Sequence, residues 1–184
     1  MITPATARIL VVDDNRNMRY IVREMLKAAG MPRIAEAESA QSALSIASRF
    51  PIDLAIIDWQ MAPVDGVELT KMIRNGAAGP NAETKILIMT AHTELARVAA
   101  ARDAGVHGML RKPITARLLL SRVSSALSDT RPFVRAGGFY GPDRRHGQTP
   151  CYEGPLRRAS DASYDDDIVL DDAPLSAWNP RTAA

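Results

Sequence analysis

The chain has almost no cysteine, because Cys151 is the single one among its 184 residues. No internal disulfide can form, and a cytoplasmic location is the simplest expectation. No apolar run approaches the roughly 18 residues that a membrane-spanning helix needs, and no charged start followed by an apolar stretch suggests export. The sequence therefore indicates a globular chain without a membrane span or a disulfide framework, and its hydrophobic content of 46% supports a real core.

Lysine is absent from the last third of the chain. Residues 131–158 hold six arginines against Asp143 and Glu153, whereas residues 159–184 hold one arginine against six aspartates. Five glycines and six prolines interrupt residues 130–184, and no helical or strand period extends beyond a turn or two. A segment of this composition buries too little apolar surface to offset its ordering entropy. We expect a domain over residues 1–129 and a disordered tail, basic and then acidic, over residues 130–184.

Residues 1–129 alternate short apolar runs with segments of helical period. Strands are expected at residues 8–12, 33–37, 54–58, 85–89 and 108–111. Helices are expected at residues 15–28, 39–49, 66–74, 93–104 and 115–128. Five strands alternating with five helices predict an α/β fold with a doubly wound parallel sheet.

Reactive side chains stand where four of the five strands end: Asp13 with Asp14, then Asp58, Thr90 and Lys112. These strand ends share one edge of a doubly wound sheet, so the side chains should converge there. Clustered carboxylates need a cation, and ligands that are all oxygens favour Mg²⁺. A carboxylate on Mg²⁺ beside a lysine and a hydroxyl is suited to phosphoryl transfer, with Asp58 as the nucleophile. Any one of these polar residues could instead cap the helix that follows it. Capping does not explain why reactive residues stand at the same position after four strands.

Residues 8–129 resemble the receiver domain of two-component response regulators, close to the stand-alone CheY type. The matching segments are residues 10–14, 17–19, 21–23, 58–61, 65–66, 90–91 and 112–113. The resemblance implies a flavodoxin-like sheet with the strand order 2-1-3-4-5, for which CheY is itself an established example.

The resemblance also implies roles for these residues. Asp58 would accept a phosphoryl group from a histidine kinase or a histidine phosphotransfer protein. Asp14 and Asp58 would bind Mg²⁺ directly, Asp13 through water and Gln60 through its backbone carbonyl. Thr90 and Lys112 would contact the phosphoryl group, and the resulting shift would reshape the face formed by the fourth helix, the fifth strand and the fifth helix. Such a chain is a signalling phosphoacceptor rather than an enzyme acting on other molecules.

One position departs from the family pattern in a way that affects the switch. Met109 stands three residues before Lys112, where the family usually has an aromatic residue whose rotamer follows the state of Thr90. Methionine is flexible and apolar, so the switch is either transmitted differently or softer. The resemblance also implies that Gln60 and His92 flank the path of the water that attacks the phosphoryl group, although His92 could equally be an exposed polar residue at a helix start.

The tail contains a near-repeat. Tyr140 to Arg145 reads Tyr-Gly-Pro-Asp-Arg-Arg, and Tyr152 to Arg158 reads Tyr-Glu-Gly-Pro-Leu-Arg-Arg. Arginine recognises phosphate bidentately and stacks on flat rings, and the tyrosines and an aspartate add stacking faces and an acceptor for a guanine edge. The tail resembles the arginine-rich extensions of the Cle group of CheY-like regulators, which implies binding of cyclic di-GMP. The candidate residues are Tyr140, Arg144, Arg145, Tyr152, Arg157, Arg158, Ser160 and Asp161.

Three functions remain open at this point. The first is a response regulator in motility or adhesion control that acts through protein contacts, for instance with the flagellar motor. The second is a phosphorelay or phosphate-sink receiver whose tail has no ligand. The third is an adaptor for RNA or an anionic surface. Binding to DNA is not expected, since no helix-turn-helix follows the receiver.

Overall fold

The computed structural model describes residues 5–91 and 94–144. A five-stranded parallel sheet has the order β2-β1-β3-β4-β5, which confirms the predicted fold class and strand order. Its strands are β1 (Ile9–Val12), β2 (Ile34–Ala37), β3 (Leu54–Asp58), β4 (Lys85–Thr90) and β5 (Gly108–Arg111). The helices are α1 (Arg16–Ala28), α2 (Ala40–Arg49), α3 (Gly66–Arg74), α4 (Leu95–Asp103) and α5 (Ala116–Ser128), with a short 3₁₀ helix η1 at Gly79–Asn81.

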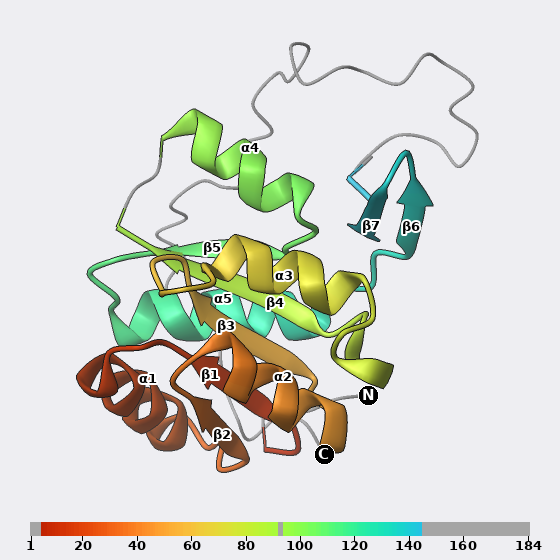
Figure 1. Ribbon diagram of the computed structural model, residues 1–184. Helices are drawn as coiled ribbons and strands as arrows, with labels where there is room; N and C mark the ends of the chain where they lie inside the picture. The colour runs from red at the N-terminus through yellow and green to blue at the C-terminus, as the bar shows by residue number, and fades with distance from the viewer. Residues whose placement is uncertain (1–4, 92–93, 145–184) are drawn as a thin grey trace. The chain divides into compact units, whose positions relative to one another are not determined.

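The helices cover the two faces of the sheet in separate groups, as Figure 1 shows. Apolar side chains of α1 and α5 pack on one face, with Leu26 and Leu119 fully buried. Residues of α2, α3 and α4 pack on the other, where Ala43 and Leu69 are buried. The central strand β3 is buried along its whole length because both of its faces are covered. This accounts for its continuous apolar run, which is typical of a parallel sheet.

Polar residues fix where the helices begin. The side chain of Asn15 accepts hydrogen bonds from the backbone N–H groups of Asn17 and Met18 at the start of α1. Asp65 accepts from the N–H of Glu68 and so caps α3. These caps satisfy donors that have no partner inside the helix. The helix boundaries therefore lie within about two residues of the expected ones, and the predicted start of α4 at Thr93 lies outside the described residues.

The prediction that the chain is disordered from residue 130 onward is wrong for residues 133–142. Strands β6 (Phe133–Ala136) and β7 (Phe139–Pro142) form an antiparallel hairpin in the same compact unit as the sheet. Gly137 and Gly138 form its two-residue turn with φ of 55° and 86°. Two successive positive φ values are what such a hairpin turn requires, and glycine adopts them without strain. The averaged composition of residues 130–184 concealed this local signal.

The remainder of the predicted tail, residues 145–184, lies outside the described residues. Within the described ranges, no helix combines the length and the apolar content that crossing a membrane would require.

Candidate functional site

Three carboxylates meet at the ends of two adjacent strands. Asp13 and Asp14 directly follow β1, and Asp58 ends β3, which pairs with β1 in parallel. One carboxylate oxygen from each residue lies within 4.8 Å of the others. Asp13 and Asp58 are buried, whereas Asp14 is exposed. The structure thus brings together the three carboxylates that the sequence pattern singled out.

Lys112 reaches this cluster from the end of β5. Its Nζ lies 2.8 Å from Oδ1 of Asp58 and 3.4 Å from Oδ2 of Asp13. Burial alone would lower the pKa of Lys112, but the hydrogen bond to Asp58 and the charges of both aspartates outweigh burial and raise that pKa. Lys112 is therefore a permanent cation beside the two buried carboxylates.

One lysine does not neutralise three carboxylates. Burial raises the pKa of Asp13 above its usual value, and the charge of Asp58 adds to this. The hydrogen bond from the N–H of Asn15 and the charge of Lys112 oppose the rise without cancelling it. A site in which a carboxylate is costly to ionise favours binding of a cation. The donors are all oxygens, so the cluster is compatible with Mg²⁺, and Asp13, Asp14 and Asp58 would hold the ion.

Arg19 holds the loop that carries two of the carboxylates. Its Nη1 donates to the backbone carbonyl oxygen of Asp13 at 2.7 Å, and its Nε lies 3.7 Å from a carboxylate oxygen of Glu36. The sequence placed Arg19 within a matching segment but assigned no role to it. Its contacts show that it positions the Asp13–Asp14 loop from α1.

Gly66 allows α3 to approach the acidic end of β3. A Cβ atom at Gly66 would lie 2.2 Å from the carbonyl oxygen of Asp58, which is far inside van der Waals contact. The N–H of Gly66 donates to the carbonyl oxygen of Trp59 at 2.9 Å. Only glycine permits this approach, so Gly66 shapes the loop on which Asp58 stands.

Thr90 and Met109 lie on the neighbouring strands. Thr90 ends β4 and is buried, and its carbonyl oxygen accepts from the N–H of Lys112 at 2.7 Å. Met109 lies in β5 opposite Ile88 and is half-buried against the core on the α2–α3–α4 side. Gln60 follows Asp58 by two residues and is exposed. His92 lies outside the described residues.

Of the proposed tail residues, the structure describes only Tyr140 and Arg144. Tyr140 lies in β7, where its ring contacts Phe133 at 5.5 Å and the Arg135 guanidinium at 4.6 Å. Its hydroxyl donates to a carboxylate oxygen of Glu83. Tyr140 is therefore part of a folded hairpin and does not lie on a free tail. Arg144 is the last described residue, and the remaining candidates (Arg145, Tyr152, Arg157, Arg158, Ser160 and Asp161) lie outside the described residues.

The family model of the response regulator receiver domain matches residues 9–124, and the chain belongs to this family. The sheet order agrees with that assignment, and the cluster of Asp13, Asp14 and Asp58 is compatible with a Mg²⁺ site.

Two curated relatives are chemotaxis proteins. The chain is 33% identical over 116 residues to chemotaxis protein CheY-3 of Vibrio cholerae, covering 63% of this chain and 88% of that protein. It is 31% identical over 116 residues to chemotaxis protein CheY of Pseudomonas aeruginosa, covering 63% of this chain and 92% of that protein. Among solved structures, Vibrio cholerae CheY4 superimposes with a TM-score of 0.61 at 28% identity, covering 65% of this chain and 98% of that one.

Proposed function

We propose that the chain is a phosphorylation-dependent signalling switch in the cytoplasm, whose phosphoacceptor is Asp58. The donor is a histidine kinase or a histidine phosphotransfer protein. The observation that carries this proposal is the position of the Lys112 Nζ, 2.8 Å from Oδ1 of Asp58 within a cluster of three carboxylates. A lysine that only stabilised the fold would need a single carboxylate partner, whereas Lys112 lies beside Asp58 in a cluster that also contains Asp13 and Asp14.

In the proposed reaction, a carboxylate oxygen of Asp58 forms a bond to phosphorus while the bond from phosphorus to the donor nitrogen breaks. Asp13, Asp14, Asp58 and the backbone carbonyl of Gln60 would hold Mg²⁺, which would supply positive charge to the phosphoryl oxygens. Lys112 supplies a second positive charge, and the Thr90 hydroxyl donates to a phosphoryl oxygen. Positioning and charge neutralisation are the main contributions of a protein to phosphoryl transfer.

The output follows from the charge that the phosphoryl group adds. It introduces about −1.5 to −2 charges and strong acceptor oxygens at the end of β3. Thr90 moves toward these oxygens, and the surface of α4, β5 and α5 changes with it. Met109 transmits this change in place of an aromatic residue. A protein that recognises this surface is the downstream partner, and the likeness to chemotaxis proteins supports motility control, with the flagellar motor as a candidate.

The phosphoacceptor can be tested with a small phosphodonor and Mg²⁺. Asp58→Asn should abolish labelling, because an amide cannot act as the nucleophile. Asp53→Asn is the matched control, since Asp53 immediately precedes the first residue of β3 and pairs with Arg8. It should label as the wild type does. Unchanged labelling of Asp58→Asn would refute the assignment.

We further propose that the arginine pairs of the tail bind cyclic di-GMP, as in the Cle-type regulators that the tail resembles. The residues are Tyr140, Arg144, Arg145, Tyr152, Arg157, Arg158, Ser160 and Asp161. Tyr140 contributes only if its ring leaves the contacts with Phe133 and Arg135. The proposal therefore rests mainly on the paired arginines of the repeat.

Calorimetric titration of the full chain with cyclic di-GMP tests the tail. Binding should be lost in the double variant Arg157→Ala/Arg158→Ala and retained in Arg33→Ala, which removes an exposed arginine of the receiver. Absence of heat with the full chain would leave the phosphate-sink alternative. Tighter binding of RNA, with an affinity that falls steeply as salt rises, would support the adaptor alternative.

A further inference from the structure

The β6–β7 hairpin is too small to be stable without support. An isolated two-stranded hairpin is at best marginally stable in water. Here the ring of Phe133 lies 5.0 Å from the Arg74 guanidinium and 5.6 Å from the ring of His107. Phe133 is thus held between α3 and the residue that precedes β5. The hairpin is ordered because it docks on the receiver.

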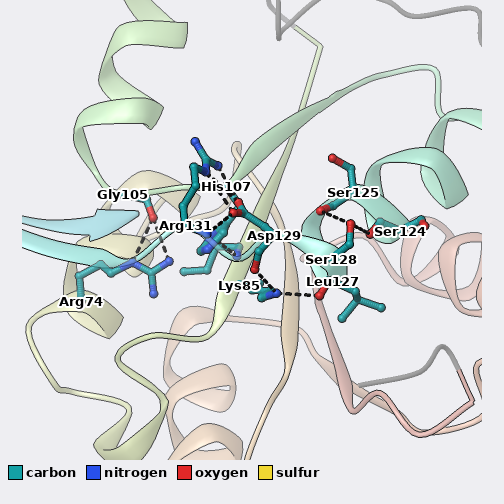
Figure 2. A network of polar contacts seen from close by, with 11 residues as sticks. Arg74, Lys85, Gly105, His107, Ser124, Ser125, Leu127, Ser128, Asp129 and Arg131 are labelled. Carbon is teal, nitrogen blue, oxygen red and sulfur yellow. Dashed lines mark hydrogen bonds and ion pairs between the residues drawn. The ribbon is translucent and has the colours of Figure 1, made fainter. Parts of the chain in front are cut away.

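The docking site is the corner between α4 and β5, at Gly105. Its carbonyl oxygen accepts hydrogen bonds from Nε and Nη2 of Arg74 at 3.0 and 2.8 Å (Figure 2). A Cβ atom at Gly105 would lie 2.6 Å from the carbonyl oxygen of Tyr140, and one at Gly141 would lie 2.8 Å from Cα of Gly105. The backbone of β7 therefore packs directly on this corner, with no space for a side chain on either partner.

Further polar contacts hold the segment that leads to the hairpin. Nζ of Lys85 donates to the carbonyl oxygens of Leu127 and Asp129, both at 2.7 Å, as Figure 2 shows. Arg131 pairs with Asp129 at 2.7 Å. The imidazole of His107 is neutral, since burial and the charge of Arg74 lower its pKa to about 3, and its Nδ1 accepts from the N–H of Ile86. The segment that leads to the hairpin is thus attached to the start of β4, and Phe133 of the hairpin contacts His107 immediately before β5.

Helix α4 depends on this corner for its position. Ala101 is its only buried residue, Leu95 at its first turn is 62% exposed, and its N-cap Glu94 makes no side-chain capping bond. At the other end, Gly105 is held by Arg74 and β7. Toward the site, the Arg97 guanidinium lies 5.4 Å from the ring of Trp59, the residue after Asp58. Helix α4 therefore contacts the residue after Asp58 through Arg97, and the residue Gly105 beyond its C-terminal end packs against the backbone of β7.

We propose that the β6–β7 hairpin is a latch that holds α4 in its unphosphorylated position, and that phosphorylation of Asp58 loosens it. The inference rests on the proposed phosphorylation. Any displacement of α4 that moves Gly105 breaks the close backbone contact with β7, and an undocked hairpin loses the support that keeps it folded. Docking and phosphorylation then oppose each other, and the coupling acts equally in both directions.

Hydrogen exchange of the full chain tests the latch directly. Mg²⁺ with beryllofluoride, a mimic of the phosphoryl group, should speed exchange of the backbone amides of residues 133–142 by at least about fivefold, the lower end of typical allosteric coupling. The Asp58→Asn variant treated in the same way should show no change. Unchanged exchange in a wild type that is labelled by a phosphodonor would overturn the latch and leave the proposed phosphoacceptor intact. A wild type that cannot be labelled would overturn both.

The reciprocal measurement uses the hairpin. Phe133→Ala removes the ring between Arg74 and His107, so it should tighten the equilibrium binding of beryllofluoride in the presence of Mg²⁺ by about fivefold or more. Phe50→Ala makes the same chemical change at a residue that is 60% exposed at the end of α2, and should leave this affinity unchanged. Tyr140→Phe loses only the hydrogen bond to Glu83 and should give a smaller increase in affinity, which keeps the test valid if Phe133→Ala folds poorly. Equal beryllofluoride affinities in Phe133→Ala, Tyr140→Phe and wild type would contradict the latch.

Discussion

At the scale of single residues, the buried carboxylates of the site repel one another, and a bound cation would offset this repulsion. Asp13 is fully buried beside Asp58, and its pKa is raised. Asp53, beyond the other end of β3, is the opposite case. Burial acts to raise its pKa, but the hydrogen bonds and the charge of Arg8 outweigh burial and lower it. Asp13 after β1 and Asp53 before β3 therefore contribute to stability with opposite signs.

This contrast predicts the pH dependence of unfolding without Mg²⁺. A folded-state pKa that is raised means that folding retains a proton, so the contribution of Asp13 is present below its unfolded pKa near 3.8 and is lost as pH rises through the folded value. Asp13→Asn should therefore raise the free energy of unfolding at pH 7 by roughly 1–2 kcal/mol. Urea unfolding in the presence of a chelator measures it.

Asp53→Asn provides the control of opposite sign. Because folding lowers the pKa of Asp53, this residue stabilises the folded chain at pH values above its unfolded pKa. The contribution is lost as pH falls through the folded pKa. Because Arg8 is partly exposed, the variant should lose only about 0.2–1 kcal/mol at pH 7. Equal signs for the two variants would contradict the electrostatic account of the site.

At the scale of elements, the close approach of α3 to β3 depends on one missing side chain. Asp65 caps α3 and Gly66 follows it against the carbonyl group of Asp58. The clash that a Cβ atom would cause is with backbone and not with a flexible side chain. Relief would require the loop that carries Asp58 to move.

Gly66→Ala should for this reason destabilise the chain, although alanine is the better helix former by about 1 kcal/mol. We expect a loss of roughly 1–3 kcal/mol in the free energy of unfolding, typical of overpacking, together with slower labelling of Asp58. Glu68→Ala, an exposed position on the same helix whose carboxylate pairs with Lys71, should change stability by less than about 0.5 kcal/mol. A stabilised Gly66→Ala variant would show that the loop adjusts freely.

At the scale of the whole molecule, the receiver extends beyond the family match. The match ends at residue 124, yet residues 133–142 pack on α3 and on the corner between α4 and β5. The acidic site lies at the carboxyl ends of the strands, and the hairpin lies at the starts of β4 and β5. Phosphorylation and latch would therefore act from opposite edges of one sheet, with α4 between them.

A truncation series locates the end of the folded unit. The segment 1–144 should unfold at the same urea concentration as the full chain, whereas 1–129 should unfold earlier, with roughly 1–2 kcal/mol less stability, because partly buried Phe133 and Tyr140 are lost. Circular dichroism during urea titration measures the midpoints. Identical midpoints for 1–129 and 1–144 would show that the hairpin adds no stability to the receiver.

The sequence by itself determined the sheet, its order through the family resemblance, and the cluster of Asp13, Asp14, Asp58 and Lys112. Buried parallel strands are continuous apolar runs, and the polar residues at their carboxyl ends share one edge of the sheet. The local sequence pattern is therefore enough to predict both the sheet and the cluster. Only the tertiary structure decided the roles of Arg19, Gly66 and the hairpin. Gly137 and Gly138 between two short apolar runs were a hairpin signal, but such a hairpin persists only when Arg74, Gly105 and His107 support it. Those residues are distant in sequence, and their convergence on Phe133 and β7 is a property of the folded chain alone.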